Sequence, residues 1–262
     1  MLDRRDLLDR AKSPEERTLI ARVIDRIETV LKNHEAAVTE FYDPAQQNLI
    51  SPVLIKVPGI SFIWAGGYDL AERKRLVFCP EYLDVNGIAD NIGVLTVTGN
   101  LKFQSLSHRD FLGAILGLGI KREKIGDLIV TIDGCQVIVD LAVAEYMKAN
   151  LTKVHRVGVK VAMATPEELL LSPEETIEVF ATVASLRLDA VAAAGYGVSR
   201  TKVAGDIAAE KAKVNWAVVT DCAFAVKEGD TISLRGRGRV EVVRIKGETK
   251  KGRISLVLKR FK

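Results

Sequence analysis

The residues best suited to chemistry are cations in the last third of the chain. Arg187 and Arg200 fall in the first turns of two helices that the sequence predicts, and Lys202 follows closely. Unpaired N–H groups at a helix N-terminus suit phosphate oxygens, and the planar guanidinium group binds phosphate in a way that lysine cannot imitate. The pattern predicts phosphate binding, with Ser199 as the N-cap of the second helix.

Further along the chain, Lys211 and Lys213 stand two residues apart in a predicted short strand that runs to Trp216. We therefore expect their side chains to face the same side. Asn215 offers a donor and an acceptor at the turn. Trp216 fits two interpretations equally, a core side chain or a surface on which a base stacks.

Arginine and glycine alternate from Arg235 through Arg237 to Arg239. This run fits a mobile arm of the RGG type, and it also fits the edge of a strand packed close to other backbone. All three arginines are candidates for contacts with phosphate.

Charge is divided unevenly along the chain. Residues 181–262 hold 17 Lys and Arg against 8 Asp and Glu, whereas residues 1–180 hold 21 against 26. Such asymmetry is typical of a nucleic-acid-binding segment attached to another part; the alternative is a solvated basic face that binds nothing. Within the acidic part, Arg73-Lys74-Arg75 is either a second contact surface or a solvated helix face.

Length and composition exclude several classes of protein. With 262 residues, 48% of them hydrophobic and 27% charged, the chain is too apolar to be disordered and has room for one large or two to three small domains. Its longest uncharged apolar stretch, residues 111–120, is about half of what spans a bilayer. Residues 1–10 lack the apolar centre of a secretory signal, so we expect a cytoplasmic protein without membrane insertion.

The cysteines and histidines are too scattered for a disulfide framework or a typical metal site. They are Cys79, Cys135, Cys222, His34, His108 and His155. We therefore expect reduced thiols, no metal and no cofactor.

Residues 1–88 predict an α+β module. Ser13 caps a long amphipathic helix, whose apolar residues recur at a spacing of three to four as far as Phe41. A shorter helix begins at Asp43-Pro44, and two strands that pair with each other follow.

Residues 89–164 predict six elements in the order strand, helix, strand, strand, helix, strand. This is the split βαβ, or ferredoxin-like, plan that RNA-recognition folds also use. Those folds stack bases on aromatic residues of the sheet, and the strands predicted here carry no such signature. We therefore interpret this domain as a scaffold or protein-contact unit.

An acidic linker with two prolines, residues 165–177, leads into the basic domain at residues 178–262. The order of motifs in that domain resembles the S-four-type RNA-binding domain, also called the alpha-L motif. The shared elements are Arg187-Leu188-Asp189, Ser199-Arg200, Val214-Asn215, Gly229-Asp230 and Ile232. The resemblance implies RNA binding. Two residues depart from the pattern, because Glu210 and Trp216 stand where glycine is common.

Motifs over nearly the whole chain resemble the YlmH family, RNA-binding proteins with such a domain at the C-terminal end. They are Gly66-Gly67-Tyr68, Ala71-Glu72-Arg73-Lys74-Arg75, residues 108–113 and residues 120–127. The likeness is greatest to the cyanobacterial and plastid branch, called photosystem II S-four domain protein. It implies binding of rRNA or tRNA, association with the large ribosomal subunit, and a part in translation or in the rescue of stalled nascent chains.

Two alternatives come from other classes of protein. Pseudouridine synthases carry an Arg-Leu-Asp whose aspartate is catalytic, but Asp189 lies inside the expected binding domain and no second such tripeptide occurs. We therefore expect Asp189 to be a hydrogen-bond partner or a helix cap. The other alternative is a structural adaptor, for instance in photosystem II assembly, whose basic segment meets an acidic protein or membrane surface.

Together these patterns predict a non-catalytic RNA-binding protein of the α+β class. Its contacts with structured RNA on the ribosome are expected in the C-terminal domain. The expected contact residues are Arg187, Ser199, Arg200, Lys202, Lys211, Lys213, Asn215, Trp216, Arg235, Arg237 and Arg239.

Overall fold

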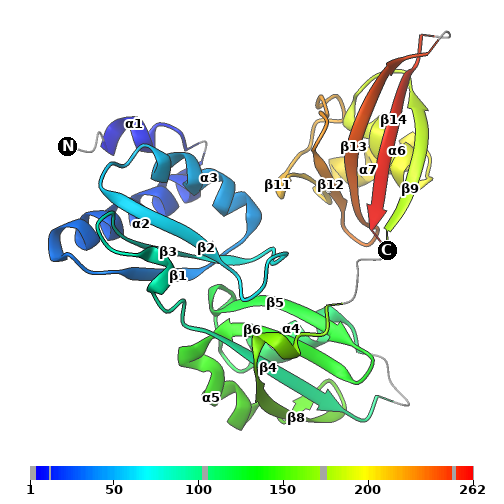
Figure 1. Cartoon of the computed structure of the whole chain (residues 1–262). Helices are drawn as coiled ribbons and strands as arrows, with labels where there is room; N and C mark the ends of the chain where they lie inside the picture. The colour runs from blue at the N-terminus through cyan, green and yellow to red at the C-terminus, as the bar shows by residue number, and fades with distance from the viewer. Residues whose placement is uncertain (1–3, 12, 102–105, 172–175, 250–251, 262) are drawn as a thin grey trace. The chain divides into compact units, whose positions relative to one another are not determined.

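The computed structural model is a mixed α+β structure with three antiparallel sheets (Figure 1). It describes residues 4–11, 13–101, 106–171, 176–249 and 252–261. The chain divides into two compact units, Met1–Leu171 and Ser172–Lys262. None of the helices in the described ranges is long and apolar enough to cross a membrane.

The long N-terminal helix begins where the sequence predicts and ends earlier. In α2 (Pro14–Asn33), the Ser13 hydroxyl accepts a hydrogen bond from the backbone N–H of Glu16 at 3.2 Å. The helix ends because His34 adopts a left-handed backbone, with φ of 58°. The prediction that the helix continues to Phe41 is wrong, since that residue lies in β1 (Ala37–Tyr42).

The first sheet has the strand order β1-β3-β2. Its central strand, β3 (Lys74–Pro80), pairs with β1 on one side and with β2 (Ile60–Ala65) on the other. The helices α1 (Arg4–Leu8), α2 and α3 (Pro44–Ile55) contribute side chains to one apolar core with this sheet. As predicted, Asp43 begins α3, in a reciprocal pair of hydrogen bonds with Gln46.

The second sheet, also in the first unit, has the strand order β5-β6-β4-β8-β7. Its elements follow in the chain as β4 (Ile92–Gly99), α4 (His108–Gly117), β5 (Ile125–Thr131), β6 (Gly134–Asp140), α5 (Leu141–Asn150), β7 (Lys153–Val154) and β8 (Val157–Ala164). Apolar side chains of α4 and α5 pack on one face of this sheet. Three short 3-10 turns complete the unit: Val85–Gly87, Arg122–Lys124 and Pro166–Glu168.

The other face of the second sheet is covered by the rest of the unit. Side chains alternate along a strand, so Gln136, Ile138 and Asp140 of β6 share this face, and all three are buried. The Asp140 carboxylate lies 3.2 Å from Nη2 of Arg75, in β3, and 2.8 Å from Nζ of Lys124. This buried ion pair joins the first sheet to the second.

Gln136 is covered by the chain that follows β8. Its side-chain amide donates to the carbonyl of Glu168 at 2.8 Å and accepts from the N–H of Leu170 at 2.6 Å. Between Gln136 and Asp140, Ile138 packs close to Gly67, in the loop between β2 and β3. The whole row along β6 is therefore occupied by segments of the same chain.

The basic run Arg73-Lys74-Arg75 leads into β3 and not into a helix, so the interpretation as a solvated helix face is wrong. Arg75 is only 4% exposed. The Arg73 guanidinium donates to the carbonyls of Ile125 at 3.0 Å and Phe41 at 2.9 Å. These two arginines hold the first unit together from within, which does not fit the alternative of a second contact surface either.

The third sheet forms the second unit and has the strand order β11-β10-β12-β13-β14-β9. Its elements are β9 (Thr176–Val183), α6 (Leu188–Tyr196), α7 (Arg200–Ala208), β10 (Ala212–Val214), β11 (Ala217–Val218), β12 (Thr231–Leu234), β13 (Gly238–Glu248) and β14 (Ile254–Phe261). Both helices lie against one face of the sheet (Figure 1).

Two glycines, Gly195 and Gly197, determine how α6 packs and where it ends. A side chain at Gly195 would lie 2.7 Å from Cγ1 of Val240, so glycine lets the helix approach β13 closely. Gly197 has a left-handed backbone, with φ of 66°, and caps the helix. The predicted linker, residues 165–177, contains a 3-10 turn and the start of β9, while the Ser172-Pro173-Glu174-Glu175 part of it lies outside the described residues.

Asp140→Asn is expected to destabilise the first unit strongly, because Arg75 would keep its charge and lose its buried partner. Breaking a buried ion pair by removing one partner costs about 3–5 kcal/mol. Urea unfolding of the full-length protein measures this loss. Glu145→Gln is the control: it removes the exposed partner of Lys148 and should change the free energy of unfolding by less than about 0.5 kcal/mol. Equal stability of D140N and wild type would contradict the role of the pair.

Candidate nucleic-acid interface

Two helices of the second unit begin with an arginine each. Arg187 is the N-cap of α6 and Arg200 is the first residue of α7. The Asp189 carboxylate lies between them, with Oδ1 3.3 Å from Nε of Arg187 and Oδ2 2.7 Å from Nη2 of Arg200. The side chain of Asp189 is 9% exposed, against 42% for Arg187 and 53% for Arg200. The carboxylate is thus buried, while each guanidinium group keeps an exposed edge.

The pKa of Asp189 is lowered from its usual value. Burial acts to raise this pKa, but hydrogen bonds from Arg200 and Arg187 outweigh burial. The carboxylate is therefore ionised at neutral pH and fixes the orientation of both guanidinium groups. Asp189 is the hydrogen-bond partner that the sequence predicts.

Ser199 and Lys202 complete the start of α7. The Ser199 hydroxyl accepts a hydrogen bond from the backbone N–H of Lys202 at 3.3 Å, which makes it the N-cap, as predicted. The side chain of Lys202 is exposed. Arg200 and Lys202 therefore stand in the first turn of a helix, where backbone N–H groups and the helix dipole favour an anion.

A second carboxylate holds two more of the predicted cations. Asp206, in α7, lies 3.4 Å from Nζ of Lys211 and 3.2 Å from Nε of Arg237. The pKa of Asp206 is also lowered, since hydrogen bonds from Arg237 and Lys211 outweigh the effect of burial. Asp206 belongs to none of the recognised motifs, so the sequence did not single it out.

Of the two lysines predicted for the short strand, only Lys213 lies within β10. Lys211 precedes β10 and its ammonium group reaches Asp206 on the helix side. Lys213 lies within β10 opposite Ser233 of β12, which is in turn opposite Arg239 of β13. Because directly opposite residues share a face, Lys213 lies on the face of the sheet away from the helices.

The arginine–glycine run forms a hairpin turn. Strand β12 ends at Leu234, β13 begins at Gly238, and Arg235-Gly236-Arg237 connects them. The hydroxyl of Tyr196, in α6, donates to the carbonyls of Ile232 at 2.8 Å and Gly238 at 3.0 Å. These bonds tie the hairpin to the helix, so the run is a turn between two paired strands, which does not fit an arm of the RGG type.

Asn215 and Trp216 form the two-residue turn of the β10–β11 hairpin, both with left-handed backbone, at φ of 48° and 66°. The Asn215 amide donates to Asp230 at 2.8 Å and accepts from the N–H of Thr231 at 2.9 Å, so its side chain fixes the neighbouring loop. Trp216 is partly exposed, and it is not among the side chains that make the core in the described part of this unit.

The predicted contact residues are thus divided between two faces and the turns. The helix side carries Arg187, Ser199, Arg200, Lys202, Lys211 and Arg237. The opposite face of the sheet carries Lys213 and Arg239, and the turns carry Asn215, Trp216 and Arg235. Sequence reasoning missed Asp206 and also Phe180, an exposed aromatic residue among the polar positions of β9. Its place in the alternating pattern of residues 176–183 was the available signal.

Three motifs of the first unit meet at Asp127. The hydroxyl of Tyr68 donates to its carboxylate at 2.9 Å, and the backbone N–H groups of Glu72 and Arg73 donate at 2.7 and 3.1 Å. Burial raises the pKa of Asp127. These motifs are therefore explained by the packing of the loop between β2 and β3 onto β5.

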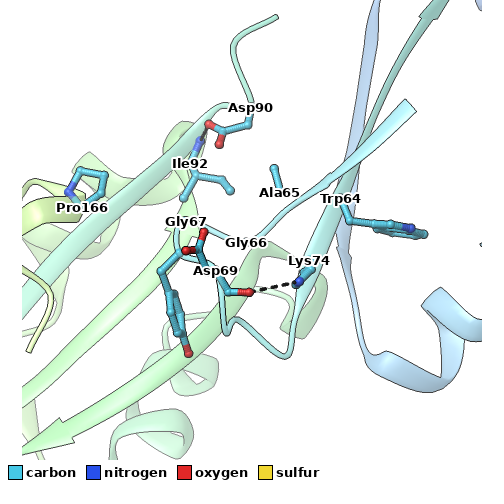
Figure 2. A pocket seen from close by; sticks show the side chains of 10 residues that line it. Trp64, Ala65, Gly66, Gly67, Asp69, Lys74, Asp90, Ile92 and Pro166 are labelled. Atoms are coloured by element: carbon cyan, nitrogen blue, oxygen red, sulfur yellow. Dashed lines mark hydrogen bonds between the residues drawn. The ribbon is translucent and has the colours of Figure 1, made fainter. Parts of the chain in front are cut away.

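The same loop lines a pocket of about 490 Å³ (Figure 2). Gly66, Gly67 and Asp69 form part of its wall, and the ammonium group of Lys74 donates to the carbonyl of Asp69 at 3.5 Å. No group of three His, Cys, Asp or Glu that could hold a metal ion occurs within the described ranges. All of the residues that the sequence predicts for phosphate binding lie in the second unit.

Three family models match consecutive parts of the chain. "YlmH, N-terminal" matches residues 15–83, "Putative RNA-binding domain in YlmH" matches residues 90–168, and "S4 domain" matches residues 186–232. The last match contains both arginines that hold Asp189, together with Asp206 and the β10–β11 hairpin.

One curated relative matches almost from end to end. "Ribosome-associated protein quality control protein P2" of Bacillus subtilis (strain 168) is 34% identical over 249 residues, which are 95% of this chain and 96% of the relative. A solved structure, "Cell division protein ylmH from Streptococcus pneumoniae", aligns with a TM-score of 0.50 at 24% identity, over 60% of this chain and 96% of that chain. The structural match shows a shared fold.

Asp189→Asn is expected to loosen both arginines and to lower the stability of the second unit by about 1.5–3 kcal/mol, the usual range for hydrogen bonds to charged groups. The pKa of Asp189 in the folded protein lies below the usual 3.8. The loss of stability caused by the substitution should therefore reach its full size above about pH 5. It should disappear as the pH falls through the lowered pKa. Urea unfolding of wild type and D189N across this pH range measures it, and a difference that does not change with pH would contradict the pairing.

Proposed function

The chain belongs to the YlmH family, and from that premise we propose that it binds structured RNA on the ribosome and catalyses no reaction. The observation that carries the proposal is the buried carboxylate of Asp189, which holds two half-exposed guanidinium groups at the starts of two helices. The name of the Bacillus subtilis relative supports a role in ribosome-associated quality control. We propose that role for this chain as well.

The helix side suits a folded RNA. Structured RNA is recognised largely by its shape and through its phosphates and 2′-hydroxyl groups, and fixed cations on a rigid surface can meet phosphates at set positions. Arg187, Arg200 and Lys202 supply such cations at the helix N-termini, where the backbone adds its own attraction for anions. Lys211 and Arg237 extend the surface, each held by Asp206.

The same contacts support binding over catalysis. A catalytic aspartate must reach the base that it attacks, whereas both oxygens of Asp189 are bonded to arginines and its side chain is buried. We therefore assign to Asp189 the positioning of cations and not the chemistry of a pseudouridine synthase.

We further propose three domains, residues 1–88, 89–164 and 178–262, with a linker at residues 165–177. The strand order β5-β6-β4-β8, with two helices on one face, supports the split βαβ plan for the middle domain.

For the middle domain we propose a scaffold role. RNA-recognition folds of this plan bind bases on the open face of the sheet. Here that face carries the buried row Gln136, Ile138 and Asp140, which the chain itself covers. A base would have to displace the loop between β2 and β3 or the segment that follows β8.

Arg200→Ala in the full-length protein is expected to weaken binding to structured rRNA fragments by a similar factor whatever their sequence. Loss of one phosphate contact should also reduce the slope of log K against log salt by about 1. Fluorescence anisotropy at several salt concentrations measures both. Lys153→Ala, an exposed lysine of β7 in the first unit, is the matched control and should leave both quantities unchanged.

An R200A protein with the affinity and salt slope of wild type would refute the helix-side surface. Sedimentation with large ribosomal subunits provides the cellular test, in which R200A should be depleted from the subunit fraction. A new modified nucleoside, formed when the protein is incubated with RNA and a methyl donor, would contradict the non-catalytic part of the proposal.

Trp216→Gly separates the two interpretations of this residue. Glycine adopts the left-handed backbone of this turn without strain, so the variant should be more stable than wild type by about 1 kcal/mol. We propose that the indole stacks on a base, and its loss should then lower RNA affinity about fivefold or more. Trp216→Phe keeps a ring and should retain most of the affinity. A W216G protein that binds RNA like wild type would exclude stacking.

A further inference from the structure

The sheet of the second unit has a second face, away from α6 and α7. It is built mainly from β9, β13 and β14, which lie outside residues 186–232, the part that matches the S4 domain. Opposite residues of antiparallel strands share a face, so the strand registers define its surface. Each row on this face takes one residue from β13, one from β14 and one from β9. One row is Glu241, Lys259 and Glu178, and the next row is Arg244, Val257 and Phe180. Phe261 and Thr176 form the row at one end.

Two aromatic rings stand on this face with cations over them. Phe180 is 68% exposed, and Nζ of Lys246 lies 5.3 Å from the centre of its ring. The ring of Phe261 has Arg239 over it, with Cζ at 4.9 Å, and Lys259, with Nζ at 5.0 Å. A cation above a ring occupies the face of that ring. A base that stacks on one of these rings therefore takes the place of a cation, or uses the part of the ring that the cation leaves open.

Positive charge predominates around the rings. The cations of this face are Lys213, Arg239, Arg244, Lys246 and Lys259, and its carboxylates are Glu178 and Glu241. Lys213 and Arg239, which the helix side leaves out, belong to this set because their strands place them in one row through Ser233. Aromatic faces among cations are the combination that binds unpaired nucleotides, whose bases stack while their phosphates meet the charges.

We propose that this face is a second RNA-binding surface, specific for a single-stranded segment, whose bases stack on Phe180 and Phe261. Phe180 pairs with Val257, and Phe261 stands four residues further along β14, so the rings are separated by about 13 Å along the strand. An extended chain of nucleotides spans that distance, whereas bases that are paired in a helix offer no free face to a ring. This surface goes beyond the proposed function, which concerns folded RNA on the helix side.

The test compares two probes on the full-length protein: a labelled oligouridylate, which has no folded structure, and a stable rRNA hairpin. The double variant Phe180→Thr, Phe261→Thr keeps residues that favour strands. We expect it to bind the oligouridylate about tenfold more weakly or worse, and the hairpin within about twofold of wild type. Arg200→Ala should weaken binding of the hairpin and leave binding of the oligouridylate unchanged. Met163→Thr removes an exposed apolar side chain from β8 in the other unit and should change neither affinity.

Each outcome decides between the surfaces. If the double variant binds oligouridylate like wild type, or if Arg200→Ala alone removes that binding, the second surface is refuted. If the double variant instead lowers the sedimentation mass of the protein, the face is an interface between copies of the chain and the proposal is overturned. Loss of oligouridylate binding in the double variant supports the second surface. If no protein, wild type included, binds the hairpin, only the proposed function of the helix side is refuted.

Discussion

A carboxylate removed from water must be matched by cations, and this constraint shapes both units of the protein. In the first unit, Asp140 is matched by Arg75, which is itself buried, so this pair joins two sheets inside the unit. In the second unit, the partners of Asp189 are two arginines that keep an exposed edge. The same chemistry gives a structural joint in one place and a pair of positioned surface cations in the other. The two sites differ because Arg75 is buried, whereas Arg187 and Arg200 are partly exposed.

As we propose, the sheet of the second unit separates two kinds of recognition by the alternation of its side chains. On one side the helices supply charges at fixed points, which suits the regular phosphates of folded RNA. On the other side, rings and flexible lysines suit bases that are already unpaired. In the first unit, the face of the second sheet on which RNA-recognition folds bind bases is covered. Segments of the same chain lie over the buried row from Gln136 to Asp140. In the acidic half of the chain, this sheet therefore packs against other segments of the same chain.

Local signals were predicted well from the sequence, and non-local ones were not. The caps at Ser13, Asp43 and Ser199 depend on residues three positions away and were found. The end of α2 was missed because the apolar spacing of the helix continues by coincidence into β1, and only the left-handed backbone of His34 marks the end. The partners of Asp206 and the rows around Phe180 depend on strand pairing, which a single sequence does not reveal. The cyanobacterial branch and any link to photosystem II stay predictions.

The position of β14 has a consequence for how the protein is made. This strand, the last of the described ones, lies between β13 and β9, and its Leu256 and Leu258 are buried in the core that supports α6 and α7. A growing chain that has reached Glu248 already carries every motif of the S4 match, but β9 still lacks β14, the strand with which it pairs. Synthesis runs from the N-terminus, so the core beneath α6 and α7 is completed only when Leu256 and Leu258 of β14 have emerged.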